Sequence, residues 1–157
     1  MISTATKAVT NTVPVGTAPL GLAVTPDGSQ LWVCTAGAGI NAGTVVIVDT
    51  GTLATGPHPN PKSHLTGIAS GGGHFGARDL FIADPGENKL VRIRETWNYS
   101  PGDRTSSHCV WLGEDITPMY VALSPVLVGF HQDVHYVYTS NPSSGTVSVI
   151  DNLNIAD

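Results

Sequence analysis

The sequence has few charged residues, few cysteines and no long apolar run. Charged residues make up 12% of its 157 positions, about half of the ~25% that is usual in globular domains. Lysine and arginine together number only 7, and the formal net charge is −5. Because nucleic-acid binding requires basic side chains concentrated against phosphates, this composition argues against a nucleic-acid partner. No apolar stretch approaches the ~18 residues of a membrane-spanning helix, so we expect no membrane span.

The first residues also lack the features of a secretory signal. Met1 is followed by Ile2-Ser3-Thr4-Ala5-Thr6-Lys7, which has neither a basic region nor the apolar stretch of such a signal. We therefore expect either a mature or excised fragment of an exported protein, or a protein that is not exported. An apolar content of 41% is sufficient for a core. The 18 glycines and 11 prolines indicate a turn-rich chain.

What the sequence does contain is a threefold repeat of paired apolar strands. Each pair begins with a strand around an aromatic residue, which is Trp32, Phe81 or Tyr138. The second strands of the three pairs are residues 44–49, 89–94 and 146–151. The aromatic residues lie 49 and 57 positions apart, close to the ~40–50-residue period of a β-propeller blade.

Short turns of the kind found in antiparallel hairpins separate these strands. Pro26-Asp27-Gly28 offers a preset φ, a side chain that binds its own backbone, and a residue free to adopt a positive φ. Val45-Val46-Ile47-Val48 is apolar at every position, which indicates a strand covered on both faces. The sequence therefore predicts an all-β fold of four-stranded antiparallel sheets. We expect about three propeller blades per chain, in a ring that is incomplete unless it assembles.

The residues before each aromatic strand repeat as well. Val15–Gly28 returns as Thr117–Pro125, and a weaker copy lies at Leu65–Ser70. Together with the strands that follow, this unit resembles the Tyr-Val-Thr-Asn (YVTN) repeat family of β-propellers, found in surface-layer and other exported bacterial and archaeal proteins. The middle copy departs from the family pattern at Gly71–Gly76, and the third carries a longer stretch, Val126–His135. The resemblance implies an extracellular, cell-surface or periplasmic location.

The resemblance also divides the chain, residues 1–157, as a single propeller segment. It implies an outer strand at 3–16, blade one at 17–63, blade two at 64–113 and blade three at 114–157. The first outer strand then has no blade of its own, and the last blade lacks one.

An arc of three blades leaves one apolar sheet face bare at each end, and such patches mark interaction surfaces. The predicted partner is another copy of the chain, through a heterologous blade-to-blade contact that gives a closed ring or a filament. Two chains would close six blades. The alternative partner is the remaining blades of a longer chain.

The proline-rich segment 56–62 fits an outer strand and an unpaired loop equally well. Its prolines stand at every second position, so they remove N–H donors from one edge only. His58, Asn60 and Lys62 keep their donors on the other edge, as an outer strand requires.

Basic and acidic residues alternate in the second half of the chain, which we interpret as a solvated surface of mixed sign. The basic residues are Arg78, Lys89, Arg92, Arg94 and Arg104, and the acidic ones are Asp79, Glu87, Glu95 and Asp103.

Cys34 ends an apolar strand and is predicted to be a buried free thiol, whereas Cys109 lies in a predicted outer strand of blade two. A disulfide between them is disfavoured, because separate blades rarely bring two Cα atoms within ~7 Å.

The histidines do not form a metal motif. The candidate ligands are His58, His64, His74, His131 and His135. Their spacings place no two on one strand face with a carboxylate or thiol partner, as a zinc site would require. Motifs of hydrolases, haem attachment and phosphate binding are absent, and Gly71-Gly72-Gly73 is interpreted as a hairpin turn. The sequence therefore predicts no metal site, no cofactor and no catalytic residues.

The tryptophans do not indicate a repeated sugar site. A sugar-binding propeller would place an aromatic residue at an equivalent position in every blade, but Trp32 is expected in the core, and Trp97 and Trp111 lie outside the regular repeat positions. The prediction is a non-catalytic exported or cell-surface repeat scaffold acting through self-assembly or protein binding. The alternatives are a propeller lectin and a fragment of a propeller enzyme of the lactonase or lyase type. The ligand is not specified by the sequence.

Overall fold

The computed structural model describes residues 1–39, 42–58, 64–72, 78–95, 105–124 and 136–151. Within these residues every regular element is a β-strand. The strands of the first sheet are β1 (Pro19–Val24), β2 (Gln30–Thr35), β3 (Thr44–Asp49) and β4 (Thr55–Pro57). The second sheet contains β5 (Ile68–Gly72), β6 (Arg78–Asp84), β7 (Lys89–Glu95) and β8 (Thr105–Trp111). The third contains β9 (Tyr120–Leu123), β10 (Tyr136–Asn141) and β11 (Thr146–Asp151).

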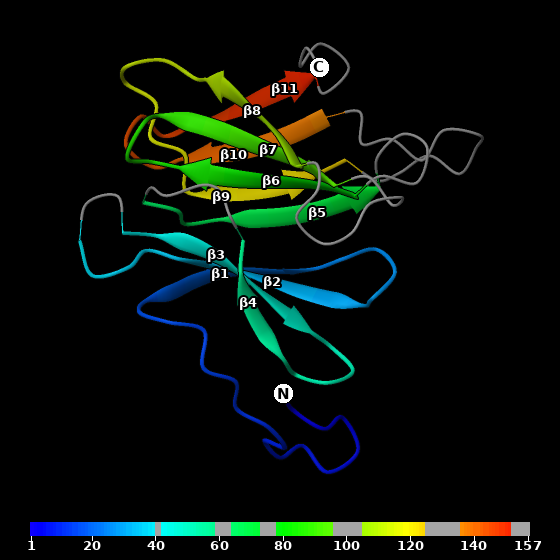
Figure 1. Ribbon diagram of the computed structural model, residues 1–157. Coiled ribbons are helices and arrows are strands. Elements are labelled where there is room, and N and C mark those ends of the chain that lie inside the picture. Colours follow the sequence, from blue (N-terminus) through cyan, green and yellow to red (C-terminus); the bar gives the residue numbers. More distant parts are fainter. Residues whose placement is uncertain (40–41, 59–63, 73–77, 96–104, 125–135, 152–157) are drawn as a thin grey trace.

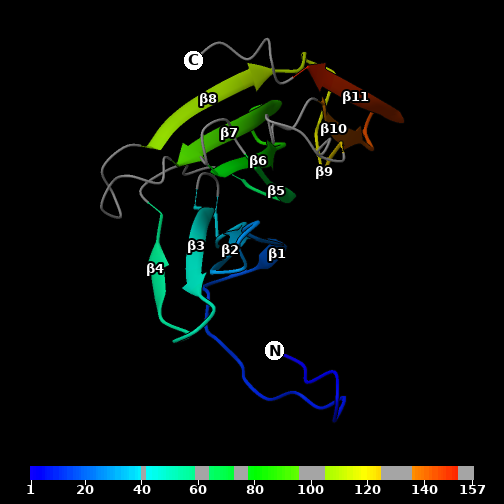
Figure 2. The same ribbon diagram turned by 90° about the vertical axis from the view of Figure 1, so that its right-hand side faces the viewer.

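Each sheet is an antiparallel meander whose strands pair in sequence order. The inner strands β1, β5 and β9 converge, and β4 and β8 lie farthest from them (Figure 1 and Figure 2). These are the blades of a β-propeller, and three of them form an open arc. The predicted all-β fold with about three blades is confirmed.

The turns follow from the residues that occupy them. Thr25 and Gln30 close the β1–β2 hairpin through a backbone hydrogen bond from Thr25 N to Gln30 O of 2.9 Å. Gly28 in this turn has a φ of 72°, which a residue without Cβ adopts at no steric cost. Asn88 has a φ of 54° in the turn between β6 and β7, and asparagine tolerates this region better than most residues.

The core lies between the sheets, in two layers. The first layer joins blades one and two and consists of Trp32, Cys34, Val45, Leu65, Ile68, Leu80, Ile82, Val91 and Ile93. The second joins blades two and three, where Phe81, Leu90 and Val137 pack with Val110, Leu112, Val121, Leu123 and Ile150. Successive side chains of a strand point to opposite faces, so Leu80 and Ile82 enter the first layer and Phe81 enters the second. This explains why β6 is apolar without alternation.

The proline-rich segment begins as an outer strand. Pro57 pairs with Val46 of β3, and His58 donates its backbone N–H to Val45 O over 2.8 Å. The backbone N–H of His58, which follows Pro57, thus points towards β3, as the outer-strand interpretation requires. Residues 59–63 lie outside the described part of the chain.

The N-terminal segment is not part of a blade within this chain. Its described pairing is an isolated antiparallel bridge between Ile2 and Val9. The expected outer strand at 3–16 would need the open edge of a neighbouring blade, so it stays a prediction. The stretches 73–77 and 126–135, which include His74 and His131, fall among residues that the structure does not describe.

Close contacts of the inner strands through two glycines hold the blades together near the centre. A Cβ added to Gly67 would lie 2.5 Å from Met119 O and 2.7 Å from the Tyr120 Cα. A Cβ on Gly21 would overlap Thr66 O in the same way. Thr66 Oγ1 also donates a hydrogen bond of 2.8 Å to Met119 O, which ties β9 to the segment before β5.

We predict that Gly67→Ala lowers the free energy of unfolding by about 1–3 kcal/mol, because the added methyl group must displace a neighbouring backbone. Gly56→Ala is the matched control, since a Cβ there meets open space, and it should be neutral or stabilising by up to about 1 kcal/mol. Urea unfolding followed by tryptophan fluorescence measures both. Equal midpoints for the two variants would contradict the close packing of β5 against β9.

Candidate functional site

On the side of blade one that faces away from blade two, the inner strand β1 is apolar and exposed, whereas Val33 of β2 and Val48 of β3 are buried on that side. The exposed residues of β1 are Leu20, Leu22 and Val24, with exposed fractions of 56, 67 and 52%. Between them in the sequence, Ala23 packs against the first core layer. Alternation along β1 therefore places the three large side chains on the side away from blade two.

Repeat positions show that this exposure is unusual for the fold. Leu22 aligns with Ile68 of blade two and Val121 of blade three. Ile68 is buried in the first core layer, with 8% of its surface exposed, and Val121 packs against the second layer. Both meet the preceding blade. Leu22 occupies the same position in blade one, which no other blade precedes within the described residues.

The outer face of blade three is the complementary case. Its exposed apolar side chains are Tyr120, Tyr136, Val147 and Val149. Val147 aligns with Val45 and Leu90, which are both fully buried between blades, yet Val147 is 62% exposed. Val45 and Leu90 each meet the following blade. The face of blade three thus carries the residues of an internal junction, and no following blade covers it within the described residues.

On the face of blade three that meets blade two, the side chains of β10 are buried and the Asn141 side chain is hydrogen-bonded. Val137, Thr139 and Asn141 on β10 are almost fully buried towards blade two. The Asn141 side-chain amide donates to Ser148 Oγ over 2.9 Å and accepts from Thr139 Oγ1 over 3.1 Å. Because every strand alternates in this way, blade three has one finished face and one open face.

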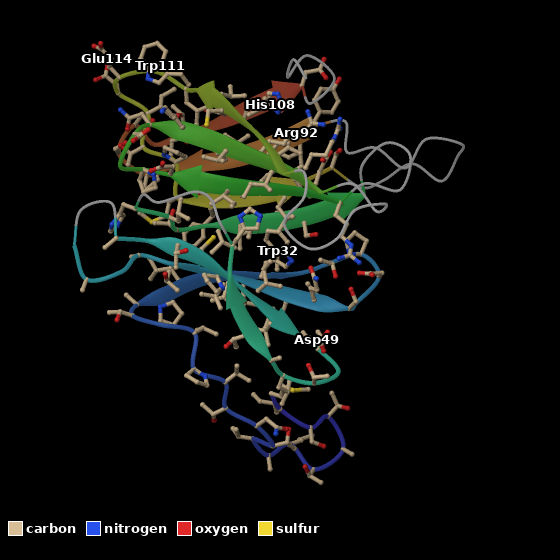
Figure 3. The ribbon with its side chains drawn as sticks, viewed as in Figure 1. Trp32, Asp49, Arg92, His108, Trp111 and Glu114 are labelled. Carbon is tan, nitrogen blue, oxygen red and sulfur yellow. The ribbon has the colours of Figure 1, made fainter. Side chains whose placement is uncertain are left out.

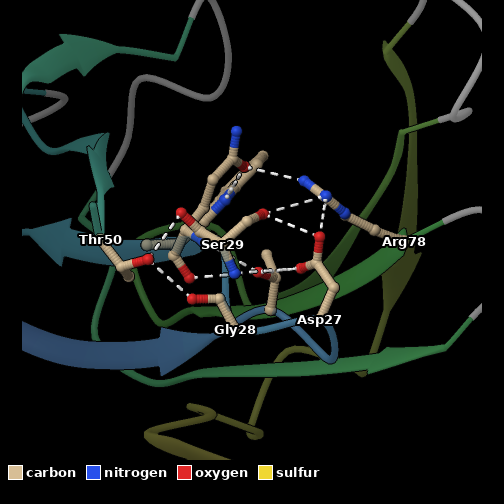
Figure 4. A network of polar contacts seen from close by, with 8 residues as sticks. Asp27, Gly28, Ser29, Thr50 and Arg78 are labelled. Carbon is tan, nitrogen blue, oxygen red and sulfur yellow. Dashed lines mark hydrogen bonds and ion pairs between the residues drawn. The ribbon is translucent and has the colours of Figure 1, made fainter. Parts of the chain in front are cut away.

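A polar network joins blade one to blade two at the edge of their shared core (Figure 4). Arg78, the first residue of β6, forms an ion pair with Asp27 in the β1–β2 turn. It also donates to Gln30 Oε1 over 3.2 Å and to Ser29 Oγ over 3.1 Å. Gln30 Oε1 accepts a further hydrogen bond from the buried Trp32 indole at 2.9 Å. These groups satisfy one another, so the network acts as a structural link between the blades.

Hydrogen bonds hold the Asp27 carboxyl in its ionised form. The Thr25 hydroxyl donates to it over 2.7 Å and contributes most, ahead of the Ser29 hydroxyl and backbone and the charge of Arg78. Together they lower the pKa of Asp27 to about 2. The pKa of Asp49 is lowered in the same manner by the backbone and hydroxyl of Thr52. Each carboxylate thus fixes a turn.

A second charged cluster is buried at the face of blade two that meets blade three. Asp79, which is 1% exposed, accepts from Arg94 Nε over 3.0 Å and from Arg92 Nη2 over 3.3 Å. Arg92 is also buried, and it pairs across the strands with His108 (Figure 3). The interpretation of these residues as solvated surface is therefore wrong for Asp79 and Arg92. The ion pair of the half-buried Lys89 with the exposed Glu87 is closer to that interpretation.

The buried position of Asp79 and Arg92 can be predicted from the alternation of side chains along their strands. Asp79 lies two residues before Phe81, and Arg92 two residues after Leu90. Residues two apart share a sheet face, so these charges had to lie on the side that Phe81 and Leu90 bury. Charge composition alone did not reveal this.

The histidines are not brought together among the described residues, where no group of three or more His, Cys, Asp or Glu side chains could hold a metal ion. His58 is buried against Trp32, with ring centroids 5.0 Å apart, whereas His64 is exposed. His135, like His74 and His131, lies outside the described residues.

The cysteines and tryptophans have structural or peripheral positions. Cys34 is a buried free thiol, as predicted, and burial raises its pKa to about 12. Cys109 is free and exposed on β8, and its partial burial also raises its pKa. Trp32 is fully buried, as expected for a core residue. Trp111 is exposed at the periphery with Glu114 (Figure 3), and Trp97 lies outside the described residues.

We predict that the link through Asp27 weakens in acid. The pKa of the Asp27 carboxyl is lower in the folded chain than its ordinary value of 3.8, so the folded chain binds this proton less readily than the unfolded chain does. Its contribution to stability is therefore present above about pH 4 and is lost as the pH falls towards 2. Asp27→Asn should destabilise the protein at pH 6 and make little difference at pH 2. Urea unfolding of both proteins across this range measures the effect, and a difference that does not vary with pH would contradict it.

In the part of the chain that the structure describes, no helix is both long and apolar enough to cross a bilayer. Neither a protein-family model nor a curated protein matches the sequence. Among solved structures, the chain is similar to the hydrazine synthase of Kuenenia stuttgartiensis, with 14% sequence identity and a TM-score of 0.36. The match covers 96% of this chain and 69% of the other. A likeness of this degree carries no argument about function.

Proposed function

We propose that this chain is a non-catalytic repeat scaffold that works through its two open blade faces, by packing blade three of one copy against blade one of another. The observation that carries the proposal is the exposure of Leu22 and Val147 at repeat positions whose counterparts pack between blades at both internal junctions. The resemblance to YVTN repeat propellers supports an exported or cell-surface role for such a scaffold.

The two faces are different, so their contact is heterologous. Blade one offers the aliphatic side chains of β1, and blade three offers tyrosines and valines. A heterologous contact either closes a ring or propagates as a filament. If this chain is part of a longer protein, its remaining blades would occupy the same faces in place of a second copy.

The apolar side chains are sufficient to drive such a contact. Each fully buried Leu or Val contributes about 1.5–3 kcal/mol, and each end face presents several large apolar residues. Association costs about 4–15 kcal/mol in lost freedom. The two faces together therefore supply a free energy of the required order.

We predict that the purified chain self-associates and that Leu22→Ser weakens the association by about tenfold or more, because one buried leucine is lost from the contact. Size-exclusion chromatography with light scattering over a concentration series measures the mass. Trp111→Ser is the control, since Trp111 is 61% exposed but lies away from both end faces. A folded wild-type monomer at every concentration would contradict self-assembly.

A further inference from the structure

The two internal junctions use glycine at the same repeat position. Gly21 of blade one and Gly67 of blade two align in Leu20-Gly21-Leu22-Ala23 and Thr66-Gly67-Ile68-Ala69. At each, a Cβ would collide with the backbone of the following inner strand: with Thr66 O for Gly21, and with Met119 O at 2.5 Å for Gly67. The normal spacing of neighbouring blades therefore requires a residue without a side chain at this position.

Blade three has a tyrosine there. In Met119-Tyr120-Val121-Ala122, Tyr120 aligns with the two glycines. Gly67 approaches the Tyr120 Cα from the side of blade two. The Tyr120 side chain is 67% exposed, and it lies on the opposite side, where the inner strand of a following blade would pack.

A blade cannot dock on blade three with the spacing of the internal junctions. Its inner-strand backbone would occupy the place of the Tyr120 Cβ, as the backbone at Met119 and Tyr120 excludes a Cβ on Gly67. The rest of the face has the composition of an ordinary junction, with Val147 in the position of Leu90. The face can therefore bind a partner, but the Tyr120 Cβ keeps the inner strand of that partner farther away than at the internal junctions.

We propose that Tyr120 sets a wider and weaker junction at the end face of blade three, and that the occupant of this junction is blade one of a second copy of the chain. This rests on the proposed function. Blade one fits as the occupant because Leu22 and Val24 align with Val121 and Leu123, which pack against the preceding blade in the second core layer. In the contact, the Tyr120 ring lies between the inner strands of the two copies.

Two substitutions at one position separate the ring from the Cβ. Tyr120→Ala removes the ring but keeps the Cβ, so it should weaken self-association. Tyr120→Gly removes the Cβ as well and restores the residue of both internal junctions. It should tighten the association about tenfold or more relative to Tyr120→Ala. Sedimentation velocity over a concentration series gives the dissociation constants of the three proteins.

Circular dichroism with urea unfolding checks that each variant is folded before its association is compared. If Tyr120→Gly associates no more tightly than Tyr120→Ala, the blocking role of Tyr120 is overturned, while assembly of the wild type still supports the proposed function. If the wild type is monomeric but Tyr120→Gly assembles, the blocking role stands and self-assembly of the natural chain fails. If all three proteins are monomeric, both proposals are overturned.

Discussion

Face-to-face burial of one sheet against the next is the interaction on which the rest of this structure depends. Both faces of blade two are buried. Its Leu80 and Ile82 side chains lie in the core layer shared with blade one, and its Phe81 and Leu90 side chains lie in the layer shared with blade three. A single four-stranded sheet with two apolar faces cannot be stable in water unless both are covered. The blades must therefore stack, and a stack of three has two faces left over.

The open faces and the closed junctions are built from the same repeat positions. Leu22 is exposed where Ile68 is buried, and Val147 is exposed where Leu90 is buried. This equivalence makes the end faces more than scattered surface hydrophobes, which are common in soluble proteins.

Polar contacts also connect neighbouring blades. Arg78 connects blade two to the turn at Asp27, and Thr66 connects its own segment to β9. Asp79 and Arg92 are buried at the second junction as an ion pair. Both residues belong to blade two, and although a buried pair is weak evidence for added stability, removing one partner would leave an uncompensated buried charge.

The sequence by itself determined the class of fold, because strand period, turn residues and a repeat of blade length are local properties. It also determined that Trp32 and Cys34 lie in the core, since both belong to a strand apolar on consecutive positions. Proline spacing alone fitted an outer strand and an unpaired loop equally well, and the pairing of Pro57 and His58 with β3 shows a strand at the start of the segment.

Only the tertiary structure decided which groups meet across blades. Arg78 and Asp27 are 51 residues apart, and no local pattern links them. The backbone approach at Gly67 depends on how closely neighbouring sheets stack, which strand periodicity does not specify. The meaning of Tyr120 has the same origin: a tyrosine in place of glycine becomes informative only when the neighbouring backbone is seen to leave no room for a Cβ.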